Sequence, residues 1–191
     1  MLPSRDDAWT LLNEYTSNES LIKHALSVEA AMRAYAQKFG ESEERWGIVG
    51  LLHDFDYERN PEPEHHPMVG ARILEQEGYP DDIIYAIKSH ATYLNLPRNR
   101  LMDRTLFAVD ELCGLITAAT LVRPSRRVAE LPVKSVKKKM KDKAFARSVN
   151  RDDIRLGVSE LGIPLDEHIG NVIAAMATIA EVLGLEGPID E

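Results

Sequence analysis

The sequence predicts an all-α fold, and three observations support that prediction. Apolar residues recur every three or four positions along most of the chain, as they do on one face of an α-helix. Glycine, proline and short polar residues separate these stretches in the pattern of helix caps. The 191 residues suffice for one domain with a real core and are short for two. We therefore expect a single domain over residues 1–191 with about eight helices, in which a core at 19–122 precedes basic and C-terminal helices at 123–191.

Caps and apolar stripes locate the helices of the first half. Thr16 and Glu19 have the spacing of a capping box for the second helix, and Gly40 is placed to end it. His24 follows Leu21 by three positions, so it lies on the core-facing side of that helix. Taken alone, such a histidine is more often a core residue hydrogen-bonded to a carbonyl than a ligand. The predicted helices cover residues 6–15, 19–39, 42–52, 67–77 and 80–90.

The second half is predicted to be equally helical. A long apolar helix at 101–122 contains Cys113, which has no second cysteine to pair with and is expected to be a small core residue. Asn150 is suited to cap a helix that follows it, and His168 has no partner in the pattern and is expected at the surface. The remaining helices are predicted at 133–147, 151–161 and 164–185.

Charge is distributed unevenly along the chain. The net charge is −8, yet residues 123–155 contain 12 Lys and Arg against 4 Asp and Glu. Such segregation either steers an anionic ligand or marks a solvated basic helix. The N-terminal residues lack the apolar region of a secretory signal, and no apolar run approaches a membrane span. We expect a cytoplasmic protein with no membrane partner and no specific binding of nucleic acid.

The pair His53-Asp54 is the first candidate functional feature. It closes the apolar run at 46–52, where an imidazole and a carboxylate are costly to desolvate unless something neutralises them. A metal ion is the simplest such partner. Further candidate ligands lie on both sides of the pair: His24, His66, His90 and Asp110.

Two local features would help to assemble such a site. Gly47 and Gly50 lie three positions apart on one helix face, and glycine inside a helix costs roughly 1 kcal/mol relative to alanine. A neighbouring helix that approaches closely, and brings its own ligand near the pair, would explain them. Pro67 is suited to the first helical position, which would place His66 at the N-cap, while His65 is expected to face solvent.

The ordered ligand set resembles a known family. His24, the run Leu52-His53-Asp54, His66-Pro67 with Gly70-Ala71, His90 and Asp110 together resemble the HD superfamily of metal-dependent phosphohydrolases. The resemblance covers roughly residues 21–122, and the sequence is similar to a bacterial and archaeal group of small predicted HD hydrolases. Members are all-helical and hold their metal between helices.

The resemblance implies a role for each ligand. His24, His53, Asp54 and Asp110 match the ligands of the first ion, and His66 and His90 match those of a second ion bridged by Asp54. His53 and Asp54 are the catalytic residues that it implies. Imidazole and carboxylate ligands suit Mn, Fe, Co, Ni, Zn or Mg, bound as one or two ions. Lys134 and Lys137, near the start of the basic helix, are expected to hold the phosphate of the substrate.

The sequence leaves three functions open. The first is a metal-dependent hydrolase of a small phosphate ester, a nucleotide among the candidates, that uses a metal-activated water. The second is a di-iron oxygenase of the same fold, and the third is an inactive signalling or binding module. Degenerate modules typically lack some ligands, whereas all are present here. Cleavage of cyclic dinucleotides is disfavoured because that branch has a paired histidine where this chain has His90-Ala91.

Overall fold

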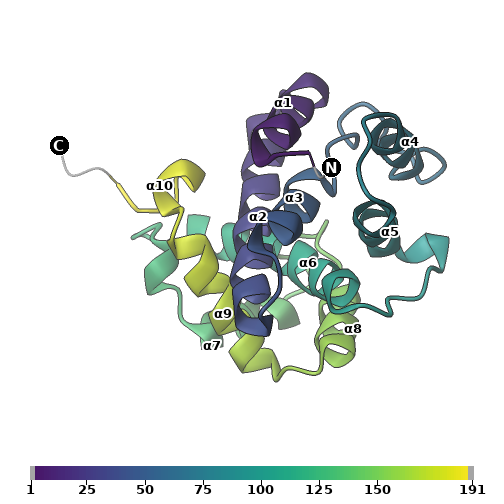
Figure 1. Ribbon diagram of the computed structural model, residues 1–191. Coiled ribbons are helices and arrows are strands. Elements are labelled where there is room, and N and C mark those ends of the chain that lie inside the picture. The colour runs from purple at the N-terminus through teal and green to yellow at the C-terminus, as the bar shows by residue number, and fades with distance from the viewer. Residues whose placement is uncertain (1–2, 189–191) are drawn as a thin grey trace. The chain divides into compact units, whose positions relative to one another are not determined.

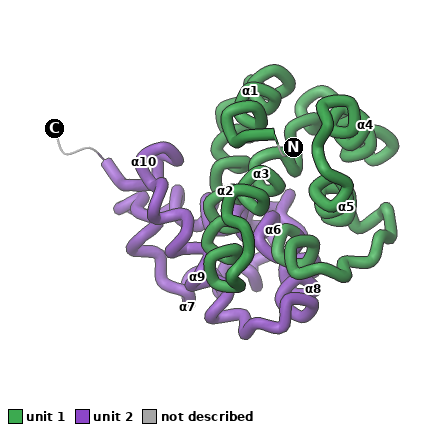
Figure 2. Tube along the Cα trace, viewed as in Figure 1, with its two compact units in different colours: residues 1–106 green, residues 107–191 purple. Residues whose placement is uncertain are grey.

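The computed structural model is all-helical, which confirms the predicted fold class. It describes residues 3–188, and these contain ten α-helices, two short 3-10 helices and no strand. The chain forms two compact units, Met1–Leu106 and Phe107–Glu191 (Figure 2). The boundary falls inside one helix, so the prediction of a single domain stays a prediction. Among the described residues, no helix is both long and apolar enough to span a bilayer. The cytoplasmic location stays a prediction from the sequence.

Helices of the two units follow one another along the chain as Figure 1 shows. The first unit contains α1 (Arg5–Tyr15), α2 (Glu19–Phe39), α3 (Glu43–Leu52), α4 (Met68–Gln76), α5 (Asp81–His90), the 3-10 helix η1 (Thr92–Leu94) and the start of α6 (Leu101–Leu121). The second unit contains the rest of α6, the 3-10 helix η2 (Val128–Glu130), α7 (Val133–Lys141), α8 (Arg151–Leu161), α9 (Leu165–Ala177) and α10 (Ala180–Leu183).

Most predicted caps are confirmed, and one is wrong. Gly40 ends α2 in the left-handed conformation, with φ 72°, and the Ser42 side chain caps α3. The expected capping box from Thr16 does not form, because Asn18 caps α2 by accepting from the amides of its first turn. Thr16 is instead buried, and its hydroxyl donates to the Phe55 carbonyl at 2.9 Å. A long-range contact therefore decides the role of this threonine.

Close packing of α2 against α3 explains the paired glycines. A Cβ at Gly50 would lie 2.8 Å from the Val28 carbonyl oxygen and 2.9 Å from the Cα of Glu29, both in the backbone of α2. A Cβ at Gly47 would lie 2.5 Å from Nε of Arg33. At Gly50 only hydrogen fits, because the neighbouring atoms are backbone, whereas the atoms near Gly47 belong to a flexible side chain. The predicted close approach is therefore confirmed at Gly50, and the helix that approaches is the one that carries His24.

Three predicted helix boundaries are corrected. The basic helix α7 ends at Lys141 and not at Arg147. The expected last helix is two helices, because α9 ends at Ala177, where the Thr178 hydroxyl donates to the Ala175 carbonyl at 2.7 Å and competes with the backbone ladder. Pro67 stands at the N-cap of α4, after a cis peptide bond, and His66 lies one position before the cap.

The second unit buries a histidine that the sequence pattern placed at the surface. His168 on α9 has no exposed area, and its Nε2–H donates to the Ala108 carbonyl of α6 at 2.8 Å. The prediction of a surface residue was therefore wrong, because α9 is covered on the face that carries the ring. Burial is the main cause that lowers the pKa of His168 from its ordinary value of 6.5. Cys113, by contrast, is buried in the core as predicted.

Candidate metal centre

His53 is buried at the end of α3 with one ring nitrogen already engaged. Its side chain has no exposed area, and its Nδ1 lies 2.8 Å from the Gly50 carbonyl oxygen one turn earlier. Because a carbonyl oxygen only accepts, Nδ1 carries a proton, and Nε2 is the nitrogen that can coordinate a metal ion. The helix thus fixes the tautomer and aims Nε2 at the space beyond its own end.

His24 reaches the same space from α2. Its Nε2 lies 3.3 Å from Nε2 of His53, and the two ring centroids are 5.1 Å apart in an edge-to-face arrangement. The close approach of the helices at Gly50 sets this distance. Although 29 positions separate these histidines in sequence, they present adjacent nitrogen atoms in one place.

His66 and His90 form a second pair, in which each Nδ1 also donates to an acceptor and the two Nε2 atoms approach each other. His66 Nδ1 donates to a carboxylate oxygen of Asp56 at 2.8 Å, and His90 Nδ1 donates to the Ile87 carbonyl. Their Nε2 atoms lie 3.4 Å apart. Both side chains are nearly buried, with 7% and 8% of their areas exposed. Two lone pairs that face each other at this distance repel unless a cation or a proton lies between them.

The carboxylate of Asp54 lies between the two pairs. Its Oδ1 is 3.2 Å from Nε2 of His66 and 3.3 Å from Nε2 of His90, whereas its Oδ2 is 3.5 Å from Nε2 of His53. Desolvation acts to raise the pKa of Asp54, but the neighbouring imidazoles outweigh it and hold the pKa well below its usual range. The distances show that Oδ1 faces His66 and His90, whereas Oδ2 faces His53.

These distances fit the requirements of bound metal ions. Two groups have donor atoms that all lie within 4.8 Å of one another: His24, His53 and Asp54, and Asp54, His66 and His90. Donors that share a tetrahedral ion at about 2.1 Å are separated by roughly 3.4 Å, close to the spacing of the Nε2 atoms. The structure thus brings together five of the six predicted ligands, with Asp54 common to both groups.

The electrostatics of the group formed by Asp54, His66 and His90 favour a cation. Burial lowers the pKa of His66, but hydrogen bonds to Asp54 and Asp56 outweigh it, and the pKa rises from 6.5 to about 9. A site that holds a proton so strongly also attracts a metal, which must displace that proton to bind Nε2.

Asp56 is a functional candidate that the sequence reasoning missed. It is 1% exposed and accepts from both His66 Nδ1 and the Gly70 amide, the latter at 2.7 Å. A Cβ at Gly70 would lie 2.8 Å from Asp56 Cγ, so glycine is needed for this contact. The sequence signals were the Asp54-Phe55-Asp56 spacing and the glycine four positions after His66. Tyr93 adds a further constraint, because its hydroxyl donates to the His66 carbonyl.

Three of the predicted site residues belong to the second unit. Asp110 lies on α6 and Lys134 and Lys137 on α7, and their roles stay predictions. Lys134 is exposed, while Lys137 forms an ion pair with Asp166 of α9 at 2.6 Å. A phosphate at Lys137 would have to compete with that carboxylate.

The helical fold is accompanied by two histidine groups that share one aspartate and could each hold a metal ion. The family model for the HD domain matches residues 21–118, slightly more than half of the chain. The chain therefore belongs to the HD domain family, as its sequence pattern predicted. Members of this family are mostly metal-dependent phosphohydrolases, and the match supports that general activity.

Curated relatives point to the same class. Ribonuclease Y of Desulfotalea psychrophila is 28% identical over 138 residues, which cover 70% of this chain and 26% of that protein. Ribonuclease Y of Mycoplasma genitalium is 26% identical over 138 residues, with 71% and 26% covered. The chain thus spans about a quarter of the length of the curated relatives that it matches. No solved structure matches it significantly.

Proposed function

We propose that this chain is a metal-dependent phosphohydrolase whose centre comprises His24, His53, Asp54, His66 and His90. One observation carries the proposal. Three imidazoles whose Nδ1 hydrogens are donated elsewhere direct their Nε2 atoms into one space around the Asp54 carboxylate. A structural histidine needs only one of its nitrogens satisfied, and such a convergence of Nε2 atoms is unfavourable unless a proton or a metal ion lies among them.

The residues fit two divalent ions. His24 and His53 would hold the first ion, His66 and His90 the second, and Asp54 would contribute one oxygen to each. Asp110 is proposed as a further ligand of the first ion, as the family pattern implies. The imidazole-rich set suits Mn, Fe, Co, Ni or Zn better than Mg, which prefers oxygen. When bound, such ions polarise a phosphoryl oxygen and lower the pKa of a coordinated water.

The chain's own residues have separate tasks in this proposal. His53 and His90 are oriented by carbonyls of their own helices, and His66 is oriented by Asp56, so the ligand positions are set before substrate arrives. The Asp54 carboxylate stays ionised at neutral pH because its neighbours hold its pKa low. Lys134 and Lys137 are proposed to contact the phosphate of the substrate.

We infer a small phosphate ester, such as a nucleotide, as the substrate. The phosphodiester of RNA is the second candidate, because both curated relatives are named as ribonucleases. The two candidates share the reaction, in which water attacks phosphorus and an alcohol leaves, and they differ in the size of the leaving group.

The first experiment measures metal content and hydrolysis together. The full chain is purified without chelator, analysed for transition metals, and screened with Mn²⁺ against phosphate monoesters, nucleotides and a single-stranded RNA. We expect up to two ions per chain and phosphate release that Asp54→Asn abolishes, since this change removes a charge common to both ligand groups. His65→Ala is the matched control, because His65 is exposed beside His66.

The outcomes separate the candidate functions. If the protein shortens RNA and does not hydrolyse small phosphate esters, RNA replaces the small ester as the proposed substrate. Oxygen consumption by the iron-loaded protein, without phosphate release, would identify the oxygenase. Two results together would contradict the proposed centre: the wild type is purified without metal, and its affinity for added metal equals that of Asp54→Asn.

A further inference from the structure

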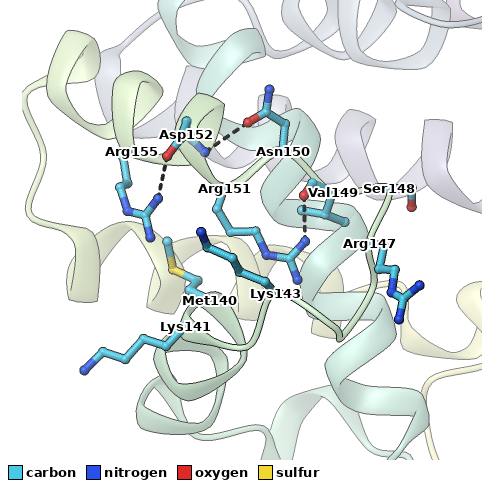
Figure 3. A pocket seen from close by; sticks show the side chains of 10 residues that line it. All are labelled: Met140, Lys141, Lys143, Arg147, Ser148, Val149, Asn150, Arg151, Asp152 and Arg155. Carbon is cyan, nitrogen blue, oxygen red and sulfur yellow. Dashed lines mark hydrogen bonds and ion pairs between the residues drawn. The ribbon is translucent and has the colours of Figure 1, made fainter.

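A cavity in the second unit lies between the end of α7, the segment 142–150 and the start of α8. Its volume is about 660 Å³, within the range of roughly 300–1,000 Å³ typical of small-molecule sites. Figure 3 shows the side chains that line it: Met140, Lys141, Lys143, Arg147, Ser148, Val149, Asn150, Arg151, Asp152 and Arg155.

The lining is strongly cationic. It contains five lysines and arginines and a single carboxylate, that of Asp152, which pairs with Arg155 at 2.7 Å (Figure 3). Within residues 3–188, the structure gives no carboxylate partner to the other four cations, Lys141, Lys143, Arg147 and Arg151. The whole chain carries a net charge of −8, so this concentration of positive charge is local. A concave surface of one sign concentrates the opposite charge.

The loop that carries two of these cations is held in place by a third. The Arg151 guanidinium donates to the carbonyls of Ala146 and Val149, each at 2.6 Å, and also to that of Phe145. Ala146 adopts a left-handed conformation with φ 41°, which is unfavourable for alanine and needs such support. The two terminal nitrogens of Arg151 thus donate to the backbone, its Nε is buried without a hydrogen-bond partner, and its charge is not paired with a carboxylate.

The N-terminus of α8 contributes little to binding of an anion in this cavity. The Asn150 side chain already accepts from the amides of Asp152 and Asp153 at 3.0 and 3.3 Å. These two acidic residues also oppose the positive end of the helix. Recognition would therefore come from the side chains of Lys141, Lys143 and Arg147.

We propose that this cavity binds a compact polyphosphate, meaning a chain of two to four linked phosphate groups, free or at the end of a small molecule. The four cations without carboxylate partners match the charge of such a chain, and a guanidinium and two ammonium groups suit its oxygens. None of the ten lining residues is aromatic. A strand of RNA would therefore find no ring on which its bases stack. The proposal concerns binding only, and it does not depend on the function proposed above.

The test measures binding of inorganic tripolyphosphate to the full chain by titration calorimetry, in chelator and about 50 mM salt. We expect one site, and an affinity at least ~10-fold lower in Lys143→Gln/Arg147→Gln, because each lost charge-assisted contact contributes more than a tenfold factor. The matched control is Lys138→Gln/Arg126→Gln, which removes the same charge from exposed residues outside the lining. The affinity of this control variant for tripolyphosphate should fall less than twofold.

A second measurement uses the unmutated protein. Acetylation of lysines is followed by mass spectrometry with and without tripolyphosphate, and protection is expected at Lys141 and Lys143 but not at Lys138. Lys138 lies on the same helix and lines a different cavity. Because no residue is changed, this result is independent of any folding defect in the variants.

Three results would overturn the proposal. They are absence of tripolyphosphate binding by the wild type, an equal loss of affinity in both double variants, and protection spread evenly over the lysines. Tighter binding of a single-stranded RNA than of tripolyphosphate, lost in the cavity variant only, would show that the cavity recognises a nucleic-acid backbone instead.

Discussion

Three of the four histidines of the central groups, His53, His66 and His90, are oriented by the partner of their Nδ1. For His53 and His90 the partner is a carbonyl three residues earlier, so the helix that carries the ring also fixes its tautomer. For His66 the partner is the buried carboxylate of Asp56, which lies ten residues away. A charged partner makes an imidazole more basic and a stronger ligand. The group around His66 therefore depends on a residue that would not itself touch the metal.

The replacement Asp56→Asn tests this dependence. Asparagine keeps the volume but loses the charge, so His66 loses its charged acceptor and its fixed orientation. We expect the affinity of the group formed by Asp54, His66 and His90 to fall by about 10–100-fold, measured by metal titration, while the group formed by His24 and His53 is retained. His65→Ala should bind like wild type. Equal metal affinity in Asp56→Asn and wild type would refute a positioning role.

His168 gives a second prediction, on the pH dependence of stability. Its folded-state pKa is lowered from 6.5, so below about pH 6.5 the unfolded chain binds a proton that the folded chain resists. The free energy of unfolding should therefore decrease as the pH falls from 6.5 toward the folded pKa, by at most ~1.4 kcal/mol per pH unit.

The variant His168→Gln isolates this contribution. Glutamine retains a donor for the Ala108 carbonyl and does not titrate, while all other histidines are unchanged. Urea unfolding in chelator at pH 7.5 and 5.5 should show a smaller loss of stability in the variant than in wild type. Parallel losses would mean that His168 titrates alike in both states.

At the scale of elements, the packing of α2 on α3 places His24 beside His53. Gly50 permits that packing, because any side chain there would meet the backbone of α2 at Val28 and Glu29. The same glycine provides the carbonyl that accepts from His53 Nδ1. One residue thus sets both the helix separation and the ring orientation.

Gly50→Ala should therefore destabilise the protein and weaken metal binding. A Cβ at 2.8–2.9 Å from main-chain atoms cannot be relieved by a rotamer change, and overpacking of this kind costs about 1–3 kcal/mol. We expect a lower melting temperature and a lower affinity of the metal for the His24 and His53 group. Calorimetry and metal titration measure the two effects.

Gly114→Ala is the matched control on another helix. Its Cβ would meet only a methyl group of Val149, at 3.7 Å, which is ordinary contact. Because alanine favours helix by roughly 1 kcal/mol over glycine, this variant should be as stable as wild type or more stable. If both replacements have the same effect, close packing at Gly50 is not what requires glycine.

At the scale of the whole molecule, metal binding should stabilise the folded chain. The proposed ligands come from α2, from the end of α3 and the turn after it, and from the segments around His66 and His90, and they are brought together only in the folded state. Binding to the folded state alone adds about 2.7 kcal/mol to the free energy of unfolding when the metal is at 100 times its dissociation constant. We expect Mn²⁺ to raise the melting temperature of wild type and chelator to reverse the rise. An equal rise in Asp54→Asn would argue against the proposed site.

The sequence by itself determined the all-α class, most helix boundaries and five residues that the structure brings together. This was possible because helical periodicity and caps are local, and because a costly polar residue on an apolar face indicates a need for a partner. The pair His53-Asp54 and the core-facing His24 were identified in this way. The close approach of a helix at Gly50 was inferred from the cost of glycine in a helix.

Tertiary structure alone decided the rest. Thr16 does not cap α2, because its hydroxyl donates to the Phe55 carbonyl. His168 is buried against α6, where it donates to the Ala108 carbonyl. The basic helix ends at Lys141, and Arg151 holds the loop that follows it. Asp56 gained its role in the same way, through a contact ten residues along the chain. Each of these outcomes depends on a partner distant in sequence. Local patterns show which groups need partners, and only the packing of the folded chain determines which partners they meet.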